Sequence, residues 1–180
     1  MKTLTLLRHA KSGWDDMSLR DFDRPLNAKG QRAAQVVGRN LRTMALTFDR
    51  IVASPAVRVV ETLAHVERGY GTPLSPDWDR RLYLASVASL IDVIQEQADD
   101  VARLLIVGHN PGLEDLVLAL VPQSTANPRR NDVEEKFPTA SVAVLTFNID
   151  RWADVANGQG TLSQFVRPRD LDPTLGPDAD

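Results

Sequence analysis

Two of the three histidines in this 180-residue sequence stand directly after short apolar runs. His9 follows Arg8 at the end of the run Thr3–Leu7. His109 lies in a Gly-His-Asn-Pro-Gly segment that follows the run Ala102–Val107. If both runs are neighbouring parallel strands, their carboxyl ends would bring the two imidazoles to one edge of a sheet, where ligands bind in open α/β folds.

A third segment with the same placement follows the apolar run Arg50–Ala53. It begins at Ser54, and Arg58 comes one helical turn later. Arginine binds phosphate through forked pairs of N–H donors, so Arg8 and Arg58 could hold a phosphoryl group between them. The combination of two histidines with several arginines indicates phosphoryl chemistry, which depends mainly on positioning and on neutralising charge.

A histidine among such arginines can act as a nucleophile. Its imidazole attacks phosphorus and forms a phosphohistidine, which water then hydrolyses. The second imidazole can donate a hydrogen bond to an equatorial oxygen. Neighbouring cationic arginines disfavour protonation of the attacking imidazole, which keeps it neutral at pH 7.

Other interpretations of these residues stay open. Either histidine could be structural, and His65, inside a predicted helix, is expected to be a surface or packing residue. Two histidines and an aspartate can bind zinc or iron, but no HxH or HExxH spacing is present and the arginines would repel a cation, so we expect no metal or other cofactor. A phosphoryl carrier or phosphate-binding module without turnover is a further alternative. Such a module would place its histidine on an exposed helix face, whereas His9 follows a strand.

The elements that must position these residues alternate along the chain. Strands are predicted over residues 3–7, 50–53, 102–107, 141–147 and 162–166. Helices are predicted from Asn27 to about Met44, from a Ser54-Pro55 start to about Arg68, from Ser86 or Ser89 to about Gln97, and over 111–121. Residues 9–24 and 122–137 are expected to be loops.

This alternation predicts a single-domain α/β fold, with a mainly parallel sheet covered by helices on both faces. We expect the catalytic domain to span residues 1–167. Residues 168–180 are rich in Pro and Asp, and we expect this tail to be poorly ordered.

Composition excludes several classes of protein. The net charge of −3 argues against general nucleic-acid binding. The absence of cysteine rules out disulfides, Cys-ligated zinc and cysteine nucleophiles. No apolar window is long enough to span a membrane, and the N-terminus lacks the pattern of a signal peptide, so a cytoplasmic location is expected.

The ordered motifs resemble those of the histidine phosphatase superfamily, also called the phosphoglycerate-mutase-like group. The resemblance is carried by LRHAKS at 7–12, where the family has its RHG-type motif, SPAVRVVET at 54–62 and VGHNPG at 107–112. Within the superfamily, DFDRPLNAKG at 21–30, GHNPGLE at 108–114 and KFPTAS at 136–141 are similar to the SixA-type phosphohistidine phosphatases. The similarity extends from about residue 3 to 167, nearly the whole chain.

The resemblance implies a metal-independent phosphatase with His9 as its nucleophile. It assigns Arg8, Arg58 and His109 to the phosphate pocket, and in the SixA-like branch Arg24 joins them. The implied partner is a phosphohistidine-bearing protein. A phosphorylated metabolite, hydrolysed by a small-molecule phosphomonoesterase of the same fold, is the alternative.

Two departures from the family pattern affect the site. Ala10 stands where the common first motif has glycine, as in many SixA-like members, and its methyl group narrows the pocket. A chain of this length has little room for the cap that usually supplies an acidic proton donor, so we expect an open site suited to a protein substrate. Asp21, three residues before Arg24, is then the candidate general acid, while Asp23 is expected to pair with Arg24. Both aspartates could instead only cap the loop.

Overall fold

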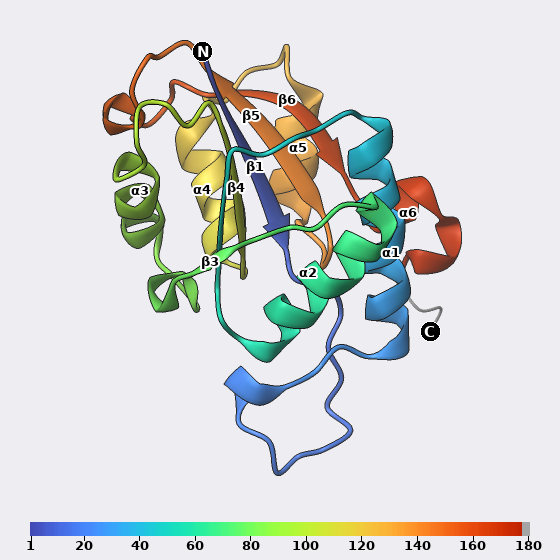
Figure 1. The fold of residues 1–180 in the computed structure, drawn as a ribbon. Coiled ribbons are helices and arrows are strands. Elements are labelled where there is room, and N and C mark those ends of the chain that lie inside the picture. The colour runs from blue at the N-terminus through green and yellow to red at the C-terminus, as the bar shows by residue number, and fades with distance from the viewer. Residues whose placement is uncertain (178–180) are drawn as a thin grey trace.

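A six-stranded sheet lies at the centre of the computed structural model, which describes residues 1–177 (Figure 1). The strands are β1 (Lys2–Arg8), β2 (Arg50–Ala53), β3 (Asp77–Trp78), β4 (Arg103–Gly108), β5 (Val142–Phe147) and β6 (Thr161–Val166). Their order across the sheet is β3-β2-β4-β1-β5-β6. The first four strands of that order are parallel, and β5 is antiparallel to both β1 and β6. The predicted α/β class with a mainly parallel sheet is confirmed.

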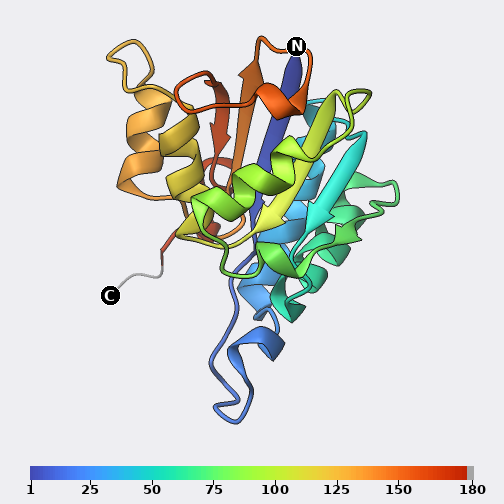
Figure 2. The same ribbon diagram turned by 90° about the vertical axis from the view of Figure 1, so that its left-hand side faces the viewer.

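Helices cover both faces of the sheet, as Figure 2 shows. They are α1 (Ala28–Thr43), α2 (Val57–Tyr70), α3 (Val87–Gln95), α4 (Gly112–Leu120), α5 (Pro128–Glu135) and α6 (Pro168–Leu171). Short 3₁₀ turns add η1 (Asp21–Asp23), η2 (Arg80–Leu82), η3 (Trp152–Asp154) and η4 (Pro173–Leu175). Within residues 1–177, no helix has both the length and the apolar character that crossing a membrane requires.

The core consists of two apolar clusters, one on each side of the sheet. In β4, Leu104 and Ile106 point into the cluster shared with α3 and α4, whereas Leu105 and Val107 point into the cluster shared with α1 and α2. All four side chains are fully buried. Burial of both faces explains why the β4 segment is an almost continuous apolar run, and each such side chain stabilises the fold by about 1.5–3 kcal/mol.

Close packing between α1 and α2 fixes the helix that carries Arg58. A Cβ atom on Gly38 of α1 would lie 2.1 Å from the carbonyl oxygen of Val66, and one on Gly69 of α2 would lie 2.1 Å from that of Gln35. Any larger residue would therefore push the two helices apart.

Two predicted boundaries differ from the structure. Helix α2 begins at Val57 rather than at Ser54-Pro55, because the Ser54 hydroxyl accepts a hydrogen bond from the Ala56 N–H and contacts a histidine instead of capping the helix. The segment 122–137, expected to be a loop, contains α5. Arg130 anchors this helix, since its buried guanidinium donates to the carbonyl oxygens of Val121 and Leu118 at 2.9 and 3.2 Å.

The segment 168–177 is folded, contrary to the expectation of a poorly ordered tail. It forms α6 and η4, and the Asp170 carboxylate caps α6 by accepting from the Arg167 backbone N–H at 2.9 Å. Leu171 and Leu175 pack against the core cluster on the α1 and α2 side. These two leucines hold the segment against the core, although its Pro- and Asp-rich composition had suggested poor order. Positions 178–180 of the expected tail lie outside the described residues.

Candidate active site

The carboxyl ends of β1, β2 and β4 meet at one cleft of about 310 Å³. Strand register brings them together, because Arg8 pairs with Gly108 and Ala53 pairs with Val107. The ring centroids of His9 and His109 are 5.2 Å apart. The residues that line the cleft are Arg8, His9, Lys11, Ser12, Arg24, Arg58, Leu84, His109, Asn110 and Thr139. The residues expected to form the phosphate pocket all belong to this set.

His9 is held as a neutral imidazole of defined tautomer. Its Nδ1 lies 2.7 Å from the Ala10 carbonyl oxygen, which can only accept, so Nδ1 carries the proton and Nε2 carries the lone pair. The residue is 7% exposed. Burial lowers the pKa of His9 to about 3 despite the opposing hydrogen bond to Ala10, and the nearby charges of His109, Arg8 and Arg58 lower it further. Desolvation therefore outweighs the arginines as the cause of neutrality.

His109 has the opposite tautomer. Its Nδ1 lies 3.4 Å from an Arg58 guanidinium nitrogen, which can only donate, so the proton resides on Nε2, and Nε2 donates to the Ser54 hydroxyl at 2.8 Å. Burial, followed by the positive charge of Arg58, lowers the pKa of His109 to about 4. The edge of the Tyr83 ring packs against the imidazole at a centroid distance of 5.3 Å.

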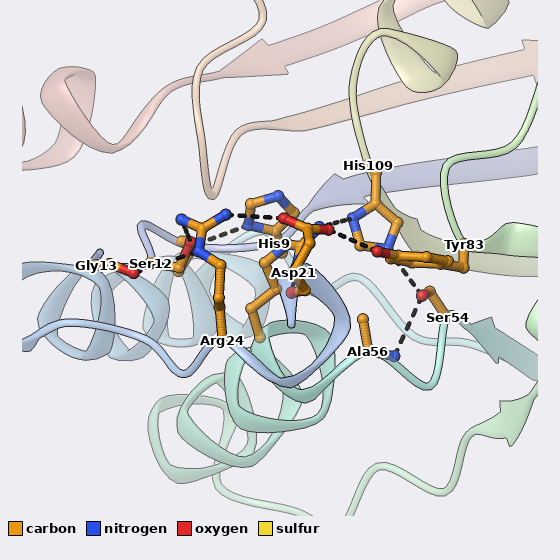
Figure 3. Close-up of polar contacts among 11 residues, drawn as sticks. His9, Ser12, Gly13, Asp21, Arg24, Ser54, Ala56, Tyr83 and His109 are labelled. Carbon is orange, nitrogen blue, oxygen red and sulfur yellow. Dashed lines mark hydrogen bonds and ion pairs between the residues drawn. The ribbon is translucent and has the colours of Figure 1, made fainter. Parts of the chain in front are cut away.

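Asp21 lies beside the cleft and contacts three of its neighbours. Figure 3 shows the carboxylate between Arg24 and Tyr83. It accepts hydrogen bonds from Tyr83 at 2.6 Å and from Arg24 and Arg58 at 3.0 Å each. The Asp21 carbonyl oxygen accepts another from Arg58 at 2.7 Å.

These contacts lower the pKa of Asp21 to about 2, with the Tyr83 hydrogen bond as the largest cause and the two arginines adding to it. The carboxyl is ionised at neutral pH and is a poor proton donor, so its contacts favour a role in holding Arg24 and Arg58 over the expected general acid. Asp23 was expected to pair with Arg24, but this prediction is wrong. The Asp23 carboxylate forms an ion pair with Arg20 instead, at 2.8 Å.

Arg24 is positioned by the loop that follows β1, which projects from the body of the molecule (Figures 1 and 2). Its guanidinium donates to the Ser12 hydroxyl at 2.8 Å and stacks on Trp14, with the guanidinium carbon 3.3 Å from the ring centroid. Trp14 and Met17 are 61% and 80% exposed. The loop therefore combines a fixed arginine with a solvent-facing apolar surface.

Arg8 extends from the end of β1 into the cleft lining. One of its terminal nitrogens donates to the Phe137 carbonyl oxygen at 2.8 Å, and the Asn110 side chain donates to the same oxygen at 3.1 Å. The buried Arg8 Nε has no hydrogen-bond partner among the described residues. A bound anion would give this N–H the acceptor that it lacks.

Ser54, Thr62 and Tyr83 lie behind the cleft lining and hold its side chains in place, and they were not identified from the sequence. Ser54 was assigned to a helix cap, although its place at a strand end could have indicated its contact with His109. Thr62 accepts from the Ala10 N–H at 2.9 Å and donates to the Arg58 carbonyl oxygen, and its spacing from Arg58 was the available signal. Tyr83 follows η2 and carries no local signal for its contact with Asp21. Across residues 1–177, no three His, Asp or Glu side chains are grouped so that they could hold a metal ion.

Comparisons with known proteins agree with this geometry. The family model of the histidine phosphatase superfamily (branch 1) matches residues 4–82. The uncharacterized protein Rv1276c of Mycobacterium tuberculosis is 37% identical over 164 residues, which cover 91% of this chain and all of that protein. Phosphohistidine phosphatase SixA of Escherichia coli is 24% identical, with 92% of this chain and 94% of that protein covered.

A solved structure from Nakamurella multipartitia, described as a candidate phosphohistidine phosphatase SixA, has a TM-score of 0.79 and 30% sequence identity. The likeness covers 93% of this chain and 96% of that one. The strand ends that carry His9 and His109 thus lie in a fold shared with histidine phosphatases over almost its whole length. The chain belongs to the histidine phosphatase superfamily, and it is a phosphatase.

Proposed function

We propose that the chain hydrolyses phosphohistidine in a protein, without a metal ion, through a covalent phosphohistidine on His9. The observation that carries this proposal is the hydrogen bond from His9 Nδ1 to the Ala10 carbonyl oxygen, together with the burial of His9. Both leave Nε2 unprotonated at neutral pH in a residue that lines the cleft, which is the state that nucleophilic attack on phosphorus requires.

The reaction has two displacement steps. In the first, the Nε2 lone pair forms a bond to phosphorus while the bond from phosphorus to the leaving group breaks. In the second, water attacks phosphorus, the bond to His9 breaks, and inorganic phosphate leaves. Arg8, Arg24 and Arg58 supply the positive charge around the transferred group. His109 lines the same cleft and accepts a hydrogen bond from Arg58 through Nδ1, which helps to position that guanidinium.

The state of Asp21 supports a substrate with a good leaving group. An alkyl phosphate expels a strongly basic alkoxide and needs a proton donor, whereas phosphohistidine expels a far less basic imidazole. The Asp21 carboxylate is ionised, and it already accepts hydrogen bonds from Tyr83, Arg24 and Arg58. A site with this carboxylate suits phosphohistidine better than an alkyl phosphate.

The surroundings of the cleft support a protein as the substrate. The exposed side chain of Trp14, which stacks on Arg24, and that of Met17 on the same projecting loop offer apolar contact area. The E. coli relative carries the name phosphohistidine phosphatase.

The decisive experiment traps the intermediate. During turnover of a ³²P-labelled phosphohistidine protein, rapid quenching at alkaline pH should give a label on His9 that resists alkali and is released by acid. His9→Ala should lose at least about 10³-fold in rate, because it removes the unprotonated Nε2 that attacks phosphorus. The matched control, His65→Ala, should retain the activity of the parent protein.

Two outcomes would reject the proposal. A label on Ser, Asp or another histidine would contradict the assignment of His9 as the nucleophile. Stoichiometric binding of phosphoryl groups without release of phosphate would instead identify a carrier or binding module.

A further inference from the structure

A second cavity adjoins the candidate active-site cleft, and we call it the annex cavity. It has a volume of about 390 Å³ and shares Arg8, Lys11 and Thr139 with the cleft. Its walls come from the first turns of α1, the loop between α5 and β5, and the C-terminal segment of α6 and η4. Six basic side chains line it, namely Arg8, Lys11, Lys29, Lys136, Arg167 and Arg169.

Within residues 1–177, the carboxylates that act on this lining lie at its edge. No aspartate or glutamate of this part of the chain is among the residues that line the annex cavity. At its edge, Asp170 forms an ion pair with Arg167 at 3.0 Å and also acts electrostatically on Arg169. Asp132 and Glu135 act on Arg167 from a greater distance.

Lys136 and Arg169 have the fewest polar contacts among the basic residues of the lining. Within residues 1–177, neither side chain makes a hydrogen bond or an ion pair. Like charges gathered around a small cavity repel one another, and an anion that enters it would relieve that repulsion. The annex cavity is therefore complementary to a negatively charged group.

The walls of the annex cavity are held in place before any ligand binds. Lys29 Nζ donates to the Gly176 carbonyl oxygen at 2.5 Å, which ties the C-terminal segment to α1. Leu171 and Leu175 anchor the same segment in the core. A preformed site loses less free energy on ordering when it binds, so the charge of the lining can contribute directly to affinity.

We infer that the annex cavity is an anion-binding subsite for a second anionic group of the substrate, a phosphate or a carboxylate on the molecule whose phosphoryl group reacts at His9. The inference rests on the proposed function of the cleft. Arg8, Lys11 and Thr139 line both cavities, so the two cavities are immediate neighbours, and a ligand with two anionic groups has only a short distance to span. The second anion can come from an acidic side chain near the phosphohistidine of a protein, or from a metabolite with two acidic groups.

The first test is calorimetric binding of alkane bisphosphonates with increasing spacer length, compared with alkyl monophosphonates. At the best spacer length, the bisphosphonate should bind at least about tenfold more tightly, the gain that charge-assisted contacts to two basic side chains can give. Lys136→Gln/Arg169→Gln should abolish this gain while monophosphonate affinity stays within about twofold. The control, Arg39→Gln/Arg129→Gln, removes the same charge from exposed positions outside the cavity and should retain the gain.

The second test separates the two sources of the anion by kcat/KM. A preference for a phosphohistidine peptide with flanking Glu over one with flanking Gln, lost in Lys136→Gln/Arg169→Gln, would identify a protein side chain. A preference for an alkane bisphosphate over an alkyl monophosphate, lost in the same variant, would identify a metabolite.

No gain for any bisphosphonate, or a gain that survives in Lys136→Gln/Arg169→Gln, would overturn the inference. Calorimetry needs no turnover, so it tests the annex cavity separately from catalysis. If the parent protein binds bisphosphonates more tightly than monophosphonates but does not hydrolyse phosphohistidine, that result counts against the proposed function alone.

Discussion

The two buried histidines should make the stability of the protein fall between pH 7.5 and pH 5.0. Burial lowers the pKa of His9 to about 3 and that of His109 to about 4, whereas an unfolded histidine has the ordinary value of 6.5. Below pH 6.5, His9 and His109 therefore bind protons in the unfolded chain but stay neutral in the folded protein. The stabilisation is complete above pH 6.5 and is lost as pH falls towards the folded values.

The size of this loss in unfolding free energy depends only on the pKa of histidine in the unfolded chain, provided that the pKa in the folded protein is about 4 or lower. A pH of 5.0 is about 1.5 below the pKa of a histidine in the unfolded chain, so that histidine is almost fully protonated there. Each of the two histidines therefore lowers the free energy of unfolding by about 2 kcal/mol relative to pH 7.5. Asp21, with its pKa lowered to about 2, titrates mostly below this window. The two histidines together should therefore cost about 4 kcal/mol.

The assay is urea unfolding of the parent and of His9→Asn at pH 7.5 and pH 5.0 at constant ionic strength. Asparagine keeps an N–H donor for the Ala10 carbonyl oxygen but cannot titrate. The difference in unfolding free energy between the two pH values should shrink by about 2 kcal/mol in His9→Asn, whatever the substitution costs at either pH. His65→Asn, at a partly exposed position of α2, should keep most of the pH dependence. An equal pH dependence in the parent and in His9→Asn would mean that folded His9 protonates near pH 6.5, which would refute its description as a neutral nucleophile.

Three further predictions concern catalysis. Arg58→Ala should cost roughly 2–4 kcal/mol of transition-state stabilisation, seen as a fall in kcat/KM that the exposed Arg68→Ala on the same helix does not share; equal effects of both would remove Arg58 from the phosphate pocket. EDTA should leave kcat unchanged, and activity that is lost to the chelator and restored by a divalent metal would contradict the metal-independent reaction. Asp21→Asn should reduce kcat/KM by a similar factor for aryl phosphate, alkyl phosphate and phosphohistidine, because it loosens Arg24 and Arg58; a loss of about 10²-fold confined to the alkyl phosphate would reinstate Asp21 as the general acid.

The sequence was sufficient to predict the convergence of His9, Arg58 and His109, because parallel strands place their carboxyl ends at one edge. His9 and His109 directly follow strands, and Arg58 lies in the first turn of the helix that comes after β2. It was insufficient for contacts that depend on packing between distant segments. Tyr83 reaches Asp21 across 62 positions of sequence, and nothing near either residue indicates that pairing.

The same limit applies to the proton donor and to the C-terminal segment. Sequence spacing favoured Asp21 as an acid, but the hydroxyl and guanidinium groups that keep it ionised come from three separate segments. The segment after residue 167 looked disordered by composition, and the contacts of Leu171 and Leu175 with the core decided otherwise.

The path of the chain also determines where the protein can be attached to a tag or a surface. β1 runs from Lys2 to Arg8, so the N-terminus lies at the amino edge of the sheet, roughly 25 Å from His9 at the strand rise of about 3.3 Å per residue (Figure 1). Gly176 and Pro177, by contrast, line the annex cavity beside the cleft. A fusion or immobilisation linker at the N-terminus should leave substrate access intact, whereas one that continues from Pro177 starts at the wall of the annex cavity and should obstruct it.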